Sequence, residues 1–435
     1  MNKTTVMAAS MLSLATAATA QSSVTLFGVL DAAVSHYSVK SEFYNNTGRL
    51  ILPPAIAPAG VSRSQTALSN SGNSNSRLGF RGTEDLGGGL SASFWLEAAL
   101  ANDTGLGGGP GGVVTFNRRS TVSLAGPFGE IRLGRDYTPT FWNDTVFSPF
   151  TTVGVGANVV STVGSNLAVV KGPGSALAAS DNYLRSSNAI GYFLPSGLGG
   201  FYGQLQYALH ENVATSDTAG SPSTKGRSVG GRFGYAAGPL DVALAFAEST
   251  AADSTGVNAA GLPTGVNLKE KIQTISLGAA YDFSVVKLFA ELSQVRDRSR
   301  STTPVPVLGL LTTRESDKYN GALLGFAVPV GAGSIKGSYS RVKFDNDPGS
   351  LASPFALRRD ASVNKLAIGY EYNLSRRTAL YATAARIRVK DGQNNPAIMG
   401  AITGGSPSYL STGAGTSGYA PSKATGYDLG IRHSF

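Results

Sequence analysis

The residues with the clearest chemical potential are arginines at alternate positions of extended segments. Arg77 and Arg81 lie on one face of residues 74–86 if that segment is a strand, while Leu78 and Phe80 lie on the other. A guanidinium stays charged at any physiological pH and is weakly hydrated. Several such groups around a narrow passage would focus a positive potential that attracts anions and repels cations. The spacing therefore favours non-covalent selection of anions.

The same alternation places two further arginines. In the strand expected at 130–138, Arg132 lies on the face that would point inward if the sheet were closed, and Ile131 lies on the opposite face. Thr121 and Ser123 are expected to face inward in the preceding segment, and this parity selects Arg119. The alternative for each arginine is an ion pair in the wall or at a subunit interface. Candidate partners for such pairs are Glu84, Asp85, Glu97 and Glu130.

Motifs for catalysis, cofactors and metals are weak. A GxGxxG pattern at Gly107, Gly109 and Gly112 lies between strand-like segments with no helix after it. The chain has no cysteine, and its histidines are far apart in the sequence: His36, His210 and His433. The carboxylates of DNDPG at 345–349 could bind a loop Ca²⁺, although the segment is equally an ordinary turn. We expect no enzyme activity and no cofactor, with this Ca²⁺ as the open alternative.

Composition excludes several protein classes. Only 14% of the 435 residues are charged and the mean hydropathy is +0.00, which fits neither a disordered chain nor a helical membrane protein. Beyond the first 20 residues no apolar run reaches 18 residues. The net charge is +9, but the basic residues are scattered singly. We therefore expect them to line a surface rather than to bind nucleic acid.

The first 20 residues have the features of a signal peptide. Lys3 provides a positive start, Val6 to Ala18 a short apolar stretch, and Ala18 and Ala20 the small residues of a cleavage site. We expect cleavage near Ala20, export of the chain, and one domain over residues 21–435.

After the signal peptide, polar and apolar residues alternate with a period of two, as expected for strands with one face on each side of a sheet. Sixteen segments show this pattern: 22–37, 74–86, 90–101, 113–126, 130–138, 184–195, 200–210, 226–238, 240–249, 269–283, 285–296, 316–330, 334–344, 360–374, 378–390 and 422–435.

Short and long connections alternate strictly between these segments. Seven are tight, such as LGGGL at 86–90 and GPFG at 126–129. The long ones cover about 38–73, 102–112, 139–183, 211–225, 250–268, 297–315, 345–359 and 391–421. This asymmetry predicts an all-β, 16-stranded antiparallel transmembrane β-barrel with short periplasmic turns and long external loops, rather than a soluble β-sandwich.

The side chains on the two faces of the last two segments predict a water-filled interior. In residues 422–435, one face carries Tyr427, Leu429, Ile431 and Phe435, and the other carries Asp428, Gly430, Arg432 and Ser434. Arg386 and Arg388 likewise alternate with Ile387 and Val389, which predicts both arginines on the inner face. Sixteen strands form a barrel too wide for side chains to fill, so we expect an aqueous channel.

Four segments together resemble the general porins of β-proteobacterial type: SSVTLFGVLDAAV, SRLGFRGTEDLGGGLSASFWLE, FNRRSTVSLAGPFGEIRLGRD and the terminal GIRHSF. The resemblance implies a homotrimer of sixteen-stranded barrels, each narrowed by an inward-folded third loop. It adds Arg185 to the basic cluster, and Arg118 in place of Arg119, so both members of that pair remain candidates. It also implies that the terminal strand, with Tyr427, Leu429, Ile431 and Phe435, is the signal read by the barrel-assembly machinery.

The third loop spans about 138–183, a length that is usually functional. Its FWNDTVFSPF segment provides aromatic anchors for packing against the wall, and the alternative is a loop folded over the rim. Asp136, Asp144 and Asp181 lie near or within it and could create a transverse field opposite the arginines.

These features predict passive diffusion of small hydrophilic solutes and ions across the outer membrane of a Gram-negative bacterium, with a preference for anions. The alternative is a solute-specific outer-membrane channel, which would show saturable transport and aromatic or polar tracks along the lumen.

Overall fold

The computed structural model describes residues 23–43, 60–171, 182–211, 223–257, 263–305, 309–345, 361–392, 395–401 and 419–435. The expected signal peptide lies outside the described residues.

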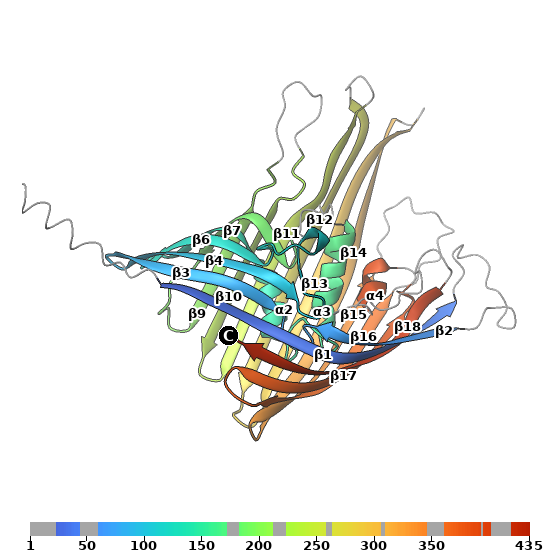
Figure 1. Ribbon diagram of the computed structural model, residues 1–435. Helices are drawn as coiled ribbons and strands as arrows, with labels where there is room; N and C mark the ends of the chain where they lie inside the picture. The colour runs from blue at the N-terminus through green and yellow to red at the C-terminus, as the bar shows by residue number, and fades with distance from the viewer. Residues whose placement is uncertain are drawn as a thin grey trace, which may run out of the picture.

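The described chain is almost entirely β-structure (Figure 1). The strands are β1 (Ser23–Phe43), β2 (Val61–Asn70), β3 (Arg77–Gly87), β4 (Leu90–Ala101), β5 (Leu106–Gly107), β6 (Arg119–Gly126), β7 (Gly129–Tyr137), β8 (Arg185–Phe193), β9 (Phe201–Ala208), β10 (Ser228–Ala237), β11 (Leu240–Val257), β12 (Pro263–Asp282), β13 (Lys287–Val305), β14 (Gly309–Val330), β15 (Gly333–Asp345), β16 (Ser362–Asn373), β17 (Thr378–Lys390) and β18 (Tyr419–Ser434). The helices are η1 (Pro110–Gly112), α2 (Pro139–Val146), α3 (Val159–Lys171) and α4 (Pro396–Gly400).

The sheet closes into a barrel because β1 pairs with β18. The C-terminal part of β1, from Ala32 to Ser41, also pairs with β2. Its N-terminal part, from Ser23 to Val29, pairs with β3. β2 and β3 are therefore two halves of one barrel strand, interrupted at residues 71–76. The two-residue β5 pairs only with β4, at the end of that strand. The wall consequently contains sixteen antiparallel strands, as the alternation predicts.

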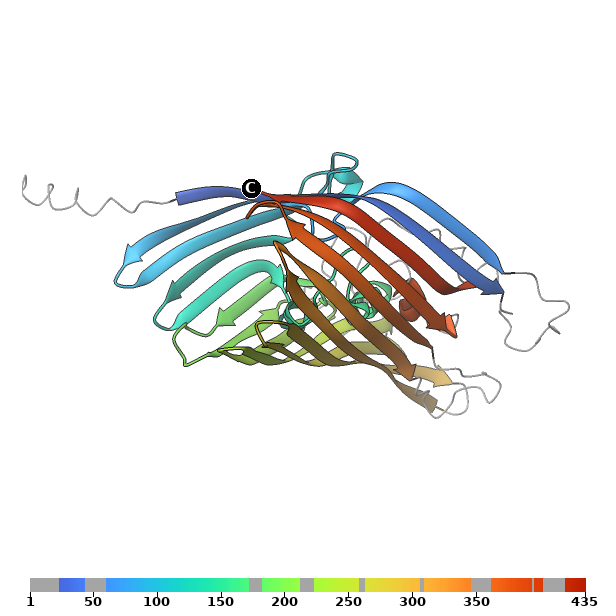
Figure 2. The same ribbon diagram turned by 90° about the horizontal axis from the view of Figure 1, so that it is seen from below.

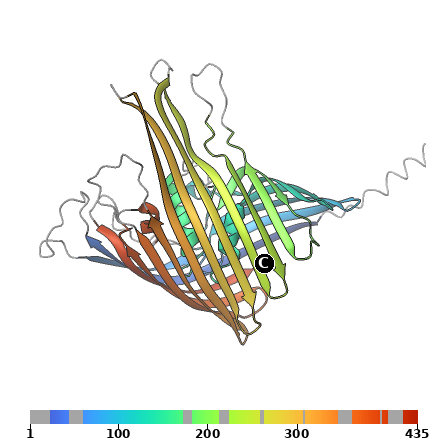
Figure 3. The same ribbon diagram turned by 180° about the vertical axis from the view of Figure 1, so that it is seen from behind.

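Several strands extend further than their sequence pattern indicates. β1 and β2 include residues 38–43 and 61–70 of the region expected to be a loop at 38–73. The loops expected at 250–268 and 297–315 are largely strand, because the β11–β12 and β13–β14 hairpins continue beyond the rest of the barrel (Figures 1 and 3). In the other direction, β6 begins at Arg119 rather than at residue 113.

The outer face carries the apolar side chains. Tyr427, Leu429, Ile431 and Phe435 are all exposed on it, with the parity expected from the sequence. Tyr281, Phe283, Tyr370 and Tyr372 are exposed near the short turns, where an aromatic girdle would lie. Within the described residues, no helix is both long enough and apolar enough to cross a membrane.

Apolar side chains fill one side of the lumen. Inside the ring of strands, α3 and α4 pack on each other and on the inner wall (Figure 2). Leu167 of α3 and Ile398 of α4 are almost completely buried in this cluster. We call the two helices the apolar plug.

The plug overturns one expectation from the sequence. Ile387 and Val389 face inward and pack in the apolar cluster, so Arg386 and Arg388 lie exposed on the outer face. The alternation in β17 is confirmed, but the predicted inward position of both arginines is wrong, because the interior is apolar at this height.

Shortening a plug residue should destabilise the barrel. Leu167→Ala leaves a cavity in the apolar cluster and should lower the free energy of unfolding by about 2–5 kcal/mol. The matched variant Leu106→Ala, at a half-exposed site, should change it by less than about 0.5 kcal/mol. Circular dichroism during denaturant unfolding in detergent measures both, and equal effects would show that the plug contributes little.

Candidate functional site

Residues 71–76, which we call the inner loop, turn into the lumen where β2 and β3 separate. The backbone N–H of Asn73 donates to Asp31 Oδ2 at 2.9 Å, and the Tyr381 hydroxyl donates to the other carboxylate oxygen. Ser76 Oγ accepts from the Asp31 backbone N–H at 3.0 Å. A buried carboxylate of β1 thus holds the inner loop against the wall.

The described parts of the third loop are residues 138–171 and 182–183, and the loop enters the barrel through α2. Thr138 caps this helix by accepting from the Phe141 N–H at 3.3 Å, and Pro139 occupies a first-turn position where no N–H is needed. Asn143 Nδ2 donates to the carbonyls of Ala243 and Ser276, each at 3.2 Å. The helix therefore lies against β11 and β12, and not over the rim.

Aromatic packing supports this position. Phe147 is completely buried between α2 and the wall, in contact with Ala243 and Ala280. This is the anchoring that the FWNDTVFSPF segment predicts.

Two charged residues of the wall hold the third loop at Val155 and Ala157. Lys365 Nζ donates to the Ala157 carbonyl at 2.7 Å, and Asp428 Oδ2 accepts from the Val155 N–H at 2.9 Å. Gly154 has a φ of +67°, and a Cβ there would stand 1.8 Å from the Gly72 carbonyl oxygen. The loop touches the inner loop so closely that only glycine fits.

Between these two loops and the wall lies a cavity of about 660 Å³. Its cationic lining residues are Arg77, Arg81, Arg118, Arg119, Lys336 and Arg432, and Glu97 is the one acidic side chain among the described lining residues. The third loop contributes Phe141, Trp142, Thr145 and residues 149–153 to the lining, all of them uncharged. The described lining is therefore basic on the wall side and neutral on the loop side.

Arg118 and Arg119 both line this cavity, which removes the choice between them. Arg119 follows the alternation of β6, because it is the first residue of that strand and lies opposite Glu97 of β4 in the strand register. Arg118 precedes the strand, so its side chain is free of that constraint. Its Nε lies 2.6 Å from Glu97 Oε1, and its Nη2 donates to the Tyr137 hydroxyl at 2.6 Å.

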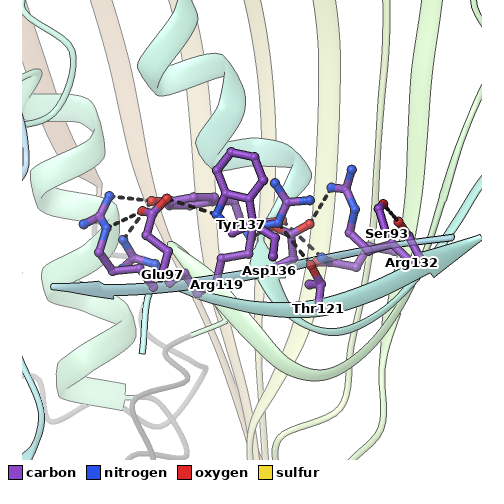
Figure 4. Close-up of polar contacts among 12 residues, drawn as sticks. Ser93, Glu97, Arg119, Thr121, Arg132, Asp136 and Tyr137 are labelled. Carbon is purple, nitrogen blue, oxygen red and sulfur yellow. Dashed lines mark hydrogen bonds and ion pairs between the residues drawn. The ribbon is translucent and has the colours of Figure 1, made fainter. Parts of the chain in front are cut away.

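Arg119 and Arg132 are joined through Asp136 (Figure 4). Arg132 Nη1 lies 2.6 Å from Asp136 Oδ2, while Arg119 Nε lies 3.5 Å from Asp136 Oδ1. Glu130 also binds Arg132, at 3.0 Å. Arg132 does not line the cavity, but Asp136 links it to Arg119, which does.

Aromatic rings support the other arginines. The Arg81 guanidinium lies 5.3 Å from the Phe27 ring centroid and 5.2 Å from that of Trp95, and Arg119 lies 4.6 Å from the latter. Arg185 lies 4.7 Å from the Tyr137 ring, outside the cavity lining. A ring face favours a cation electrostatically and restricts its position.

The expected acidic side of the constriction is not formed by the described acids. Asp136 belongs to β7 and sits among the arginines. Asp144 is buried in α2, faces the wall, and accepts from the Tyr183 hydroxyl at 2.8 Å. Burial raises the pKa of the Asp144 carboxyl. Asp181 lies outside the described residues.

Two cations of the cavity were not part of the expected cluster. Lys336 Nζ and Arg432 Nη2 bind the two oxygens of Glu371 at 2.8 and 2.9 Å. Arg432 Nη1 also donates to Asn73 Oδ1 of the inner loop at 3.3 Å. Strand parity placed Arg432 inward, but only the closed barrel brings β15 and β18 to the same cavity as β3.

No group of three histidine, aspartate or glutamate side chains within the described ranges is arranged to hold a metal ion. Of the turn considered for Ca²⁺, only Asp345 is described, and it binds Lys343 and Asn320.

A closed antiparallel barrel with an apolar exterior and a charged cavity in its lumen defines a channel of the outer-membrane type. The chain belongs to the Gram-negative porin family, whose model matches residues 4–392. It is accordingly a porin of the Gram-negative outer membrane.

Known relatives agree with this assignment. Outer membrane porin protein 32 of Delftia acidovorans is 35% identical over 435 residues, covering 100% of both chains. The anion-selective porin from Comamonas acidovorans is 32% identical, with a TM-score of 0.65 over 95% of this chain and 100% of that one. The trimer form of OmpT from Vibrio cholerae is 12% identical and shares the fold, with a TM-score of 0.57 over 95% and 99% of the two chains.

Removing a loop anchor should loosen the constriction. Lys365→Met keeps the apolar stem but loses the donor to Ala157, a contact worth about 1.5–3 kcal/mol. We expect larger current fluctuations through single open channels. Lys390→Met, on an exposed lysine of β17, should behave like the wild type. Identical current noise in both variants would show that Lys365 does not hold the loop.

Proposed function

We propose that this porin allows passive diffusion of small hydrophilic solutes and ions with a preference for anions. The observation that carries the proposal is the charge around the cavity. With Arg132 and the paired carboxylates Glu97, Glu130, Asp136 and Glu371 included, seven cations stand against four acids. An excess of three positive charges in a narrow passage favours anions, especially since the loop side is uncharged.

Individual arginines have different roles in this proposal. Arg77 and Arg81 have no ion pair to a described carboxylate, so their charge acts most directly on a permeating ion. Arg118 and Arg119 face the same space with partly compensated charge. Arg132 and Arg185 stabilise the wall behind them. The similarity to a porin described as anion-selective supports this assignment.

A solute-specific channel is the second candidate. Aromatic rings stand around the same cavity as the arginines: Phe27, Trp95, Tyr137, Phe141, Trp142 and Phe150. An anion with an apolar body could contact both kinds of side chain, and its transport would then saturate at high concentration.

Three further properties belong to the proposal. Residues 1–20 are a signal peptide cleaved near Ala20. The barrels assemble as homotrimers, and the trimer form of the similarly folded OmpT supports this assembly. The terminal strand, which exposes Leu429, Ile431 and Phe435 on the outer face, is recognised by the barrel-assembly machinery. The channel needs no cofactor and has no enzyme activity.

Neutralising the cavity arginines should reduce anion selectivity. Three unit charges about 10 Å from an ion in water contribute about 0.4 kcal/mol each. Because the three charges attract chloride and repel potassium by equal amounts, the triple variant Arg77→Gln, Arg81→Gln, Arg119→Gln should lower the chloride-to-potassium permeability ratio on the order of fiftyfold. The reversal potential across a planar bilayer under a KCl gradient measures this ratio.

Two controls make the outcome specific. Replacing the same three residues by lysine should retain most of the selectivity. Neutralising Arg298, Arg300 and Arg314, exposed on the β13–β14 hairpin, should leave it unchanged. A reversal potential that is the same for the glutamine triple and the wild type would refute the proposal.

A further inference from the structure

The outer face of the barrel carries a group of cations near the loop ends of its last strands. Arg388 is exposed near the end of β17, and Arg341 is exposed near the end of β15. Lys423 and Lys40 are exposed near the corresponding ends of β18 and β1. Their parity is that of the apolar exterior, so none of these side chains belongs to the lumen.

Strand register makes these cations neighbours. Arg341 pairs with Asn364 of β16, which pairs with Arg388. Arg388 pairs with Lys423, which pairs with Lys40. Directly opposed residues on one face lie about 5 Å apart. We call these five residues the basic row.

The basic row lacks internal compensation. Among the described residues no carboxylate forms an ion pair with Arg341, Arg388, Lys423 or Lys40. Of the outward carboxylates nearby, Asp345 is already bound by Lys343 and Asn320. Glu42, two residues from Lys40 in β1, forms no ion pair with a described residue of the row. Like charges on opposed strand positions repel each other. An external anion would remove that cost.

An apolar groove lies directly next to the basic row. It has a volume of about 670 Å³, and Arg386, which pairs with Leu366, stands at its edge. Its floor is formed by residues two or more positions further from the loops: Leu324, Phe326, Tyr339, Leu366, Ile368 and Tyr427. Charge and hydrocarbon surface thus meet along one line of the exterior.

We propose that the basic row and the groove bind a phosphorylated lipid of the outer leaflet. The acyl chains lie in the groove, and the headgroup phosphates lie on the row. In barrels of this type the long loops face the outside, which places the row at the outer leaflet. Guanidinium groups bind phosphate through paired hydrogen bonds, and each basic residue near a membrane surface strengthens binding to anionic lipid.

The length of the row specifies the headgroup further. Arg341 and Lys40 are separated by four strand spacings, or about 19 Å. A single phosphate is too small to contact both ends. The preferred lipid therefore carries more than one phosphate and several acyl chains.

Native mass spectrometry of the full mature porin in detergent tests this site. The probes are lipid A with two phosphates, its monophosphoryl form, and inorganic phosphate as a competitor. We expect the two-phosphate lipid to bind most tightly. Arg341→Gln, Arg388→Gln, Lys423→Gln should weaken it on the order of a hundredfold. The matched triple at Arg298, Arg300 and Arg314 should bind like the wild type.

Other outcomes overturn the proposal. Equal lipid binding by both triples would show general attraction to cationic surface. Competition by millimolar inorganic phosphate would indicate a free-ion site. A change in oligomeric state without a change in lipid binding would mark the groove as a contact between copies.

Two further measurements guard against misfolding. Ile368→Trp, which fills the groove and keeps every charge, should also weaken lipid A binding, and unchanged binding would exclude the groove. The reversal potential of the basic-row triple should equal that of the wild type, because its charges lie outside the lumen.

Discussion

In the hydrocarbon of a bilayer every backbone N–H and C=O must find a partner within the protein, and here the pairing of the first and last strands makes this possible. β1 pairs with β18 along most of its length, so no edge remains between them. Closure with sixteen strands sets a circumference that wall side chains cannot fill. The interior is therefore divided by segments that fold back into it. α3 and α4 fill one side, α2 lies against β11 and β12, and the arginine-lined cavity lies between the loops and the wall.

This division explains why inward positions differ so much in chemistry. Where the wall faces the plug, inward side chains are apolar, as at Val363 and Ile387. Where it faces the cavity, many of them are cationic, as at Arg77 and Arg81. The exterior is correspondingly charged in places near the loop ends, as at Arg388. A membrane barrel is often described as apolar outside and polar inside, but here each side of the wall responds to what lies against it at that height.

Much of the fold was predictable because period-two alternation is a local property. It located the sixteen wall strands, the tight turns and the outward parity of the terminal strand. It underestimated the β11–β14 hairpins, because a stretch such as residues 297–303 has polar residues on both faces and resembles a loop. The direction of Arg386 and Arg388 depended on the plug, a tertiary contact that alternation does not encode. The inner loop is not predictable for a similar reason, since only the pairing with β1 shows that β2 and β3 form one strand.

The site was predictable to a lesser degree. Parity and family resemblance together selected the arginines of β3 and of the start of β6, which do share one cavity. They did not select Lys336 or Arg432, whose strands approach β3 only after closure. The orientation of Asp144 depends on the rotation of α2, which is determined by the burial of Phe147 and Asn143 against the wall. Loop acids were consequently harder to place than wall cations.

The two carboxylates at the seam of the barrel connect closure with the shape of the passage. Asp31 of β1 holds the inner loop, and Asp428 of β18 holds the third loop where it touches the inner loop. Neither contact has its full set of partners until the two ends of the chain have met. The contacts that hold both loops in the passage are thus complete only in a barrel whose wall is sealed. An unfinished barrel would be both open at its edge and wide at its centre, so its defects would be leakiness as well as instability.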